Sequence, residues 1–162
     1  MRSVLIICTG NICRSPMAEA LLRARLARDE ARGNWRVESA GVWTADGRPA
    51  SEYAVEAMAR RGIDLRGHLS RNVTAAMMAQ ADLVLTMSQS HAEALGAAFP
   101  THLHKVHLLS EMSGPAYDVR DPYGGTRAEY ERTAQELEQL IDRGYERIVT
   151  LVEESAARAQ SL

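Results

Sequence analysis

A cysteine and an arginine near the N-terminus have the types and the spacing needed to bind and attack a phosphoryl group. Cys8 and Arg14 enclose five residues, one of them Gly10, in the segment CTGNICRS. The glycine lets successive backbone N–H groups turn toward one oxyanion, and the planar guanidinium can hold two of its oxygens. The same groups stabilise a thiolate, which is the nucleophilic form of cysteine. The segment therefore predicts phosphoryl transfer through a cysteinyl-phosphate.

A simpler interpretation treats Cys8 as a small buried side chain at a strand end and Arg14 as a surface charge. It leaves the surroundings of the pair unexplained. An apolar stretch precedes the segment, and a helix follows it with Ser15 at the N-cap and Pro16 at the first position. A helix N-terminus attracts anions, and the hydroxyl of Ser15 can donate to the cysteine sulfur. We therefore favour the chemical interpretation.

The leaving group of such a reaction needs a proton, and a carboxyl on a mobile loop is the best donor. Asp118 and Asp121 both lie in the proline- and glycine-containing stretch 111–125. Asp121 is the stronger candidate, because Pro122 fixes the local backbone and Tyr123 can line a pocket for a ring. Asp-Pro is also a common turn element, so the residues alone leave a general acid and a turn equally open.

Apolar strands and helices alternate along the rest of the chain. We expect strands at 3–7, 35–39, 82–86 and 105–108. We expect helices at 17–32, 51–61, 72–80 and 88–99, and a last helix opened by a capping box of Thr126 and Glu129. This alternation predicts an α/β fold with a parallel sheet covered by helices on both faces. Ligands of such sheets bind beyond the carboxyl ends of the strands, where the segment 8–15 lies.

The composition excludes several other classes of protein. The chain has 162 residues, of which 46% are hydrophobic, and this length and composition are typical of one globular domain. Its net charge of -2 offers no basic excess for nucleic acid or an anionic membrane. It has no apolar run of transmembrane length, and we expect no secretory signal, because the short apolar stretch 1–7 runs straight into a glycine-containing loop. Cys8 and Cys13 are its only cysteines, which excludes a disulfide scaffold and indicates a reducing, cytoplasmic setting. Four well-spaced cysteine or histidine ligands are not available, which argues against a structural zinc site.

The segment VLIICTGNICRSPMAE, residues 4–19, resembles the signature of the low-molecular-weight protein tyrosine phosphatase family. Four further segments fall in the family's order: 39–41, 68–71, 82–87 and 121–123. The resemblance covers essentially the whole chain and implies a single phosphatase domain at 1–162. It implies a Rossmann-like, four-stranded parallel sheet and catalysis without a metal or other cofactor. It also implies a cytoplasmic enzyme that acts on a phosphorylated protein, and we expect a monomer.

The resemblance implies a role for each residue of the loop. Cys8 is then the nucleophile, Arg14 binds the phosphate and the transition state, and Asp121 is the general acid. Ser15 assists Cys8. The phosphate-binding amides would come from Thr9, Gly10, Asn11, Ile12, Cys13, Arg14 and Ser15.

Residues outside the loop support it in the family. Asn11 would hold the loop in a strained shape through contacts to Ser39 and His68. Trp43 and Tyr123 resemble the aromatic walls of the substrate cleft. The other histidines, His91 among them, are expected to be solvated or packed.

Cys13 bears on regulation, and Ile12 and the pair Gly124 and Gly125 bear on substrate choice. The family's second cysteine can form a reversible disulfide with the nucleophile, which the resemblance implies for Cys13 and Cys8, although loop packing is a compatible role. The sequence around Gly124 and Gly125 resembles the protein arginine phosphatases, whereas Ile12 resembles the tyrosine-specific members, since the arginine phosphatases carry threonine there. We predict a tyrosine phosphatase, with arginine phosphatase as the alternative.

Two further classes are weighed against a phosphatase. An arsenate reductase on this fold needs a further pair of redox cysteines, and no cysteine follows Cys13. A non-catalytic oxyanion-binding module would lack the nucleophile or the acid, and both are present in this sequence.

Overall fold

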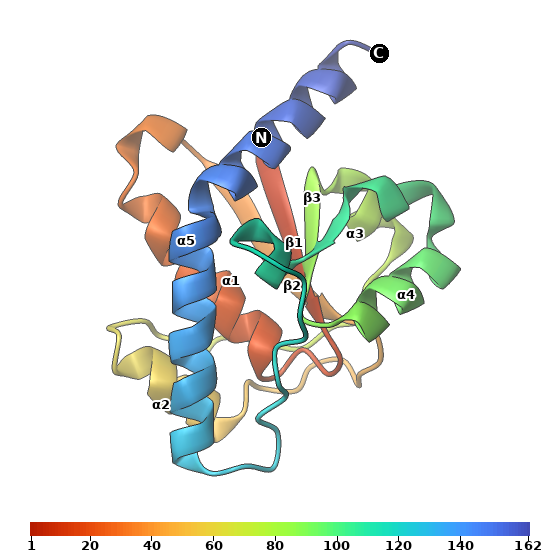
Figure 1. The fold of residues 1–162 in the computed structure, drawn as a ribbon. Coiled ribbons are helices and arrows are strands. Elements are labelled where there is room, and N and C mark those ends of the chain that lie inside the picture. Colours follow the sequence, from red (N-terminus) through yellow and green to blue (C-terminus); the bar gives the residue numbers. More distant parts are fainter.

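The computed structural model describes residues 1–162, and its centre is one parallel sheet. The four strands are β1 (Arg2–Cys8), β2 (Trp35–Gly41), β3 (Leu83–Thr86) and β4 (Val106–Leu108), in the order β2-β1-β3-β4. Their carboxyl ends meet at one edge of the sheet, and both chain termini lie at the opposite end (Figure 1). The expected four-stranded parallel sheet is thereby confirmed.

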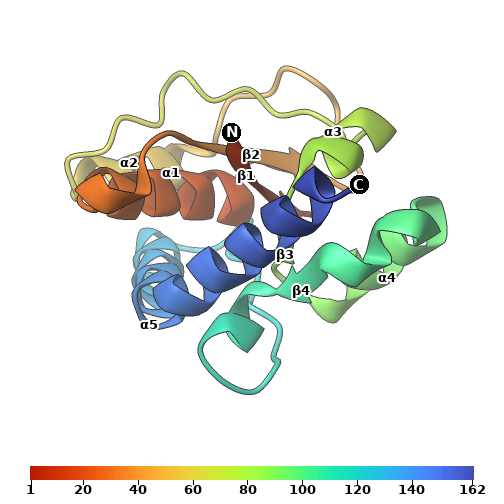
Figure 2. The ribbon, with the colours of Figure 1, turned by 90° about the horizontal axis from the view of Figure 1, so that it is seen from above.

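Helices cover both faces of this sheet. They are α1 (Arg14–Ala27), α2 (Glu52–Ala59), α3 (Ala75–Gln80), α4 (Gln89–Ala98) and α5 (Arg127–Gln160), with short 3-10 helices η1 (Glu30–Arg32), η2 (Pro100–Lys105) and η3 (Leu109–Met112). Figure 2 shows α1, α2 and α5 on one side of the sheet and α3 and α4 on the other. None of the helices has an apolar stretch long enough to cross a membrane.

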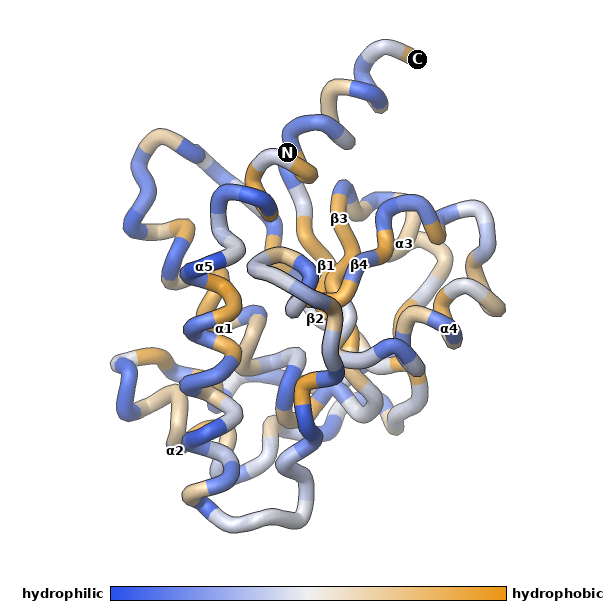
Figure 3. Tube along the Cα trace, in the orientation of Figure 1, coloured by the Kyte–Doolittle hydropathy of each residue, from blue (hydrophilic) through white to orange (hydrophobic).

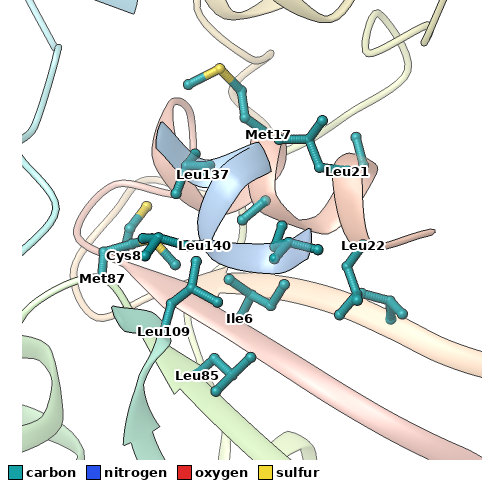
Figure 4. Packing of buried hydrophobic residues seen from close by; sticks show 14 of the residues in the cluster. Ile6, Cys8, Met17, Leu21, Leu22, Leu85, Met87, Leu109, Leu137 and Leu140 are labelled. Atoms are coloured by element: carbon teal, nitrogen blue, oxygen red, sulfur yellow. The ribbon is translucent and has the colours of Figure 1, made fainter. Parts of the chain in front are cut away.

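The alternating side chains of β1 divide the apolar interior in two. Val4 and Ile6 belong to the larger core, which they share with α1 and α5, whereas Leu5 and Ile7 belong to a smaller core with residues of α3 and α4. β1 and β3 stand out as hydrophobic in Figure 3. Figure 4 shows the larger core, where Cys8 lies at the end of β1 beside the packed apolar side chains. The nucleophile candidate therefore lies at the end of a buried strand that packs on both of its faces.

Helix α1 differs from its expected limits at both ends. It begins at Arg14 with Cys13 as N-cap, so the expectation that Ser15 caps it is wrong. The hydroxyl of Ser15 bonds other side chains of the loop instead. At the far end, the carboxylate of Asp29 accepts hydrogen bonds from Tyr145 Oη at 2.9 Å and Arg32 Nε at 3.0 Å. These contacts hold the chain in η1, so the helix ends at Ala27 rather than at residue 32.

The capping box of α5 is confirmed. The hydroxyl of Thr126 accepts from the N–H of Glu129 at 3.2 Å, and the Glu129 carboxylate accepts from the N–H of Thr126 at 2.7 Å. This cap fixes where the loop that carries Asp121 ends.

Candidate active site

The loop between β1 and α1 packs closely against the end of β2. The N–H of Val42 donates to the carbonyl of Cys8 at 3.0 Å, and the N–H of Trp43 donates to that of Thr9 at 3.2 Å. A Cβ at Gly41 would lie 2.5 Å from the Thr9 carbonyl oxygen and 3.3 Å from the nitrogen of Asn11. Only glycine permits this approach, so β2 supplies a fixed wall for residues 8–15, the candidate phosphate-binding loop, called the phosphate loop below.

Asn11 fixes the shape of the loop from behind. It is fully buried and has a φ of 56°, which strains a residue other than glycine. Its Nδ2 donates to Ser15 Oγ and to Ser39 Oγ, both at 2.9 Å. Its Oδ1 accepts from the N–H of Arg71 at 3.1 Å, and its carbonyl accepts from His68 Nε2 at 2.6 Å. The structure thus contains the contacts to Ser39 and His68 that the resemblance implies.

Ser15 connects this network to the nucleophile candidate. Its Oγ lies 2.9 Å from Cys8 Sγ, and it accepts a hydrogen bond from the side chain of Asn11. With that acceptor position occupied, the hydroxyl hydrogen is available for the sulfur. Such a hydrogen bond stabilises a thiolate.

Arg14 is buried at the start of α1, and its guanidinium is held by the loop that carries Asp121. Its Nη1 donates to the carbonyl of Val119 at 2.8 Å, and its Nη2 lies 3.4 Å from Asp121 Oδ2. Its Nε is buried and has no hydrogen-bond partner within the protein. The guanidinium is therefore oriented by the protein while its buried Nε–H is left for a ligand.

The carboxyl of Asp121 fits both interpretations that the sequence leaves open. Its Oδ1 accepts from the N–H of Tyr123 at 3.1 Å and so closes a turn around Pro122. Its other oxygen faces Arg14, and the side chain is 48% exposed. Asp118 lies elsewhere and accepts from the N–H of Gln89 at 2.8 Å. Of the two candidate acids, only Asp121 lies beside the phosphate loop.

A cleft of about 380 Å³ brings most of the predicted site residues together. It is lined by Cys8, Thr9, Gly10, Ile12, Cys13, Arg14, Trp43, Thr44, Ala45, Arg48, Asp121 and Tyr123. Trp43 and Tyr123 are 80% and 64% exposed, and Ile12 is 7% exposed because much of its side chain packs into the larger core. Asn11, Ser15, Ser39 and His68 do not line the cleft but support the loop from behind.

Cys13 sits among hydroxyl groups. Its Sγ lies 3.2 Å from both Ser51 Oγ and Tyr130 Oη. Burial raises the pKa of the Cys13 thiol and also the pKa of the Tyr130 hydroxyl. Cys13 is therefore a protonated thiol at neutral pH, which suits a second cysteine that is not the attacking group.

His91 is a site residue that the sequence analysis missed. It is buried, its Nε2 lies 2.9 Å from Thr9 Oγ1, and its Nδ1 accepts from the N–H of Ser88 at 3.2 Å. Burial, and secondarily the Arg14 guanidinium, lower its pKa to about 4. The local signal for this placement is that His91 follows Ser88 by three residues, the spacing of a helix N-cap and the side chain that bonds back to it.

The sequence matches a family model described as low molecular weight phosphotyrosine protein phosphatase over residues 3–157. The chain belongs to this family. Its low molecular weight phosphatase fold and its phosphatase activity on phosphorylated proteins follow from that membership.

Curated relatives carry two different specificities. A protein-arginine-phosphatase of Bacillus subtilis is 40% identical over 139 residues, which are 85% of this chain and 91% of the relative. A probable low molecular weight protein-tyrosine-phosphatase, EpsP of Ralstonia nicotianae, is 34% identical over 151 residues, 93% of this chain and 99% of the relative. The relatives therefore establish a phosphatase and leave tyrosine and arginine specificity open.

A solved member of the family is also similar in structure. It is a cysteine-to-serine mutant of the YwlE arginine phosphatase with a phosphorylated active-site serine. Its TM-score is 0.85 at 38% identity, and the match covers 91% of this chain and 95% of that one.

Proposed function

We propose that this phosphatase hydrolyses phosphotyrosine in proteins through a cysteinyl-phosphate on Cys8. One observation carries the proposal: the Cys8 thiol, the Arg14 guanidinium and the Asp121 carboxyl line a single cleft whose rim holds Trp43 and Tyr123. A nucleophile, an anion-binding group and an acid are thus within reach of one phosphoryl group, and aromatic side chains flank the place for its ring.

The first step transfers the phosphoryl group to the enzyme. The Cys8 thiolate attacks phosphorus in line while the bond to the tyrosine oxygen breaks, and the Asp121 carboxyl gives that oxygen its proton. Arg14 and the loop amides stabilise the charge on the equatorial oxygens. Nε of Arg14, which no protein group occupies, supports this role.

The second step releases phosphate. The Asp121 carboxylate takes a proton from a water molecule, the water oxygen attacks phosphorus, and the S–P bond breaks with Cys8 leaving as a thiolate. The Ser15 hydroxyl at 2.9 Å stabilises that thiolate. The phosphorylated serine in the solved cysteine-to-serine relative supports a covalent intermediate at this position.

The lining of the cleft supports tyrosine over arginine as the substrate residue. Ile12 adds an apolar wall, which suits a phenyl ring. A guanidinium needs acceptors, and the one carboxylate in the lining, that of Asp121, is already close to the Arg14 cation. Arg48 adds a second positive charge to the lining. Arginine specificity remains the second candidate, because Gly124 and Gly125 and the arginine phosphatase relative favour it.

The experiment compares kcat/KM for a phosphotyrosine peptide and a phosphoarginine peptide in the parent protein, in Ile12→Thr and in Ile12→Val. Valine is the matched control, because it has the shape of threonine without the hydroxyl. We expect a phosphotyrosine preference that Ile12→Thr weakens and Ile12→Val retains. A phosphoarginine preference of the parent protein would overturn the tyrosine assignment. Substantial turnover by Cys8→Ser would overturn the cysteinyl-phosphate mechanism.

The proposal extends to the setting of the enzyme. Residues 1–162 act as one phosphatase unit, as a monomer, without metal or other cofactor, and on phosphorylated protein rather than nucleic acid or membrane. The nucleophile must be a reduced thiol, which supports a reducing, cytoplasmic compartment. On oxidation, the sulfenic acid of Cys8 would condense with the Cys13 thiol and release water, which makes the enzyme sensitive to redox state.

A further inference from the structure

His91 joins helix α4 to the phosphate loop through Thr9, the residue that follows the nucleophile. The two side chains meet at 2.9 Å although 82 positions separate them in the sequence. His91 is 3% exposed, whereas Thr9 lies at the surface and lines the cleft. A buried side chain thus holds an exposed residue of the site.

The hydrogen-bond partners of His91 fix its tautomer. The N–H of Ser88 donates to Nδ1 at 3.2 Å, so Nδ1 carries no hydrogen and the neutral ring carries its hydrogen on Nε2. Nε2 therefore donates to Thr9 Oγ1. Burial and the Arg14 guanidinium disfavour the charged ring more than the carboxylates of Asp118 and Asp121 favour it, so the ring keeps this form at neutral pH.

The turn that carries His91 also holds the segment with the proposed acid. The N–H of Gln89 donates to Asp118 Oδ1 at 2.8 Å, and the N–H of Val119 donates to the carbonyl of Met87 at 2.8 Å. Two residues further along is Asp121. Residues 87–91 therefore contact both the phosphate loop and the acid-bearing segment.

We propose that His91 is a positioning residue for phosphoryl transfer, which holds Thr9 and the adjacent Cys8 in register with the Asp121 segment. The inference rests on the proposed function, because this register matters only if Cys8 and Asp121 act on one phosphoryl group. Thr9 is bonded to Cys8, so a displacement of Thr9 moves the attacking sulfur and a phosphate-binding amide together. A misplacement of about 1 Å in such a site lowers the rate by up to about a hundredfold.

The test measures kcat/KM for p-nitrophenyl phosphate, the affinity for inorganic vanadate and the melting temperature of each variant. The variants are His91→Ala, His91→Gln, Thr9→Val, Thr9→Ser and the double variant His91→Ala/Thr9→Val. Glutamine and serine retain groups that can make the hydrogen bond. His104→Ala is the matched control, because His104 is exposed and outside the cleft.

We expect His91→Ala and Thr9→Val each to lower kcat/KM about tenfold or more at a temperature where all variants are folded. We expect vanadate affinity to fall in parallel, the double variant to be no worse than the worse single variant, and Thr9→Ser to be more active than Thr9→Val because serine keeps the hydroxyl. A purely structural His91 would lower the melting temperature and leave kcat/KM and vanadate affinity within about twofold, which would overturn the inference. Effects that multiply in the double variant would also overturn it.

The two proposals can fail separately. A parent protein that binds vanadate but does not turn over phosphate esters would contradict the proposed function, and the vanadate affinities of the variants would still decide the role of His91. Normal turnover by the parent protein with unchanged values for His91→Ala and Thr9→Val would overturn the inference alone.

Discussion

Single buried side chains determine the shape of the phosphate loop, and Asn11 is the central one. It donates twice, accepts twice and keeps a positive φ that residues with a Cβ rarely adopt. The strain persists because Ser15, Ser39, Arg71 and His68 all bond to this one residue. A substitution of Asn11 therefore changes the free energy of unfolding in two ways: it removes side-chain hydrogen bonds, and it alters the backbone strain. Two different substitutions can separate these effects.

Comparison of Asn11→Ala with Asn11→Gly measures the strain. Both variants lose the side-chain hydrogen bonds and, we expect, most activity. The left-handed conformation costs an alanine about 1–2 kcal/mol, whereas glycine adds only about 0.4–1 kcal/mol of unfolded-state entropy. We therefore expect Asn11→Ala to have the smaller free energy of unfolding in urea. The opposite order would show that the loop relaxes away from its positive φ.

His91 makes stability depend on pH in a direction that can be worked out. Its pKa falls from 6.5 to about 4 in the folded protein, so between these values the unfolded state binds a proton that the folded state does not. Stability from this group is present above the unfolded pKa and is lost as pH falls through that window. His91→Gln has no titrating ring, so we expect its stability to approach that of the parent protein between about pH 7 and pH 5. A stability difference independent of pH, in urea unfolding, would contradict the lowered pKa.

At the scale of elements, the features that depend on neighbouring residues were predicted better than those that depend on contacts between distant residues. The apolar strands and the Thr126 cap follow from neighbouring residues, and both are present. The predicted start of α1 was wrong, because the side chain of Ser15, a residue type that suits an N-cap, contacts Cys8 and Asn11 instead.

His91 was missed because its contact with Thr9 depends on pairing between distant strands. β1 and β3 lie side by side, with Ile7 opposite Thr86, and this register brings the residues after each strand to one edge. The sequence alone does not say which strands pair or in which register, so it gave no sign of this contact. The contacts of Asn11 with Ser39 and His68 were expected only because the family resemblance implied them.

The cap of α5 allows a test at this scale. Thr126→Ala removes the acceptor for the Glu129 N–H, which typically costs about 1 kcal/mol, or about 2–4 °C in melting temperature for a chain of this size. Thr150→Ala is the matched control, because Thr150 is exposed inside the same helix and bonds only the carbonyl of Glu146. We expect the control to be neutral or slightly stabilising. Equal losses in calorimetry would contradict a specific role for the cap.

Across the whole molecule, α5 runs from the end of the sheet that carries the candidate active site toward the opposite end (Figure 1). Its buried face, which includes Leu137 and Leu140, covers the larger core beside α1 (Figure 4). Gly144 lies further along the helix, where η3 crosses it, and the chain runs from η3 into the segment that carries Asp121. The close approach at Gly144 therefore sets where that segment begins.

Gly144→Ala tests this approach against the ordinary preference of helices for alanine. In an open helix interior the change stabilises by about 1 kcal/mol. At this position the new Cβ would lie 2.5 Å from Met112 Cβ and 3.0 Å from the backbone carbon of Met112. Forcing such a contact costs about 1–3 kcal/mol, so we expect lower stability in urea and, because η3 moves, lower kcat.

Gly96→Ala in α4 is the matched control for this variant. Its Cβ would meet only the methyl groups of Leu103, at 3.3 and 3.7 Å, and these are the ends of a side chain that can turn away. We expect Gly96→Ala to be neutral or stabilising and to leave kcat unchanged. Because the two variants make the same chemical change in a helix, their difference isolates the contact with η3. A Gly144→Ala protein as stable and as active as Gly96→Ala would show that η3 is free to move without displacing Asp121, the proposed acid.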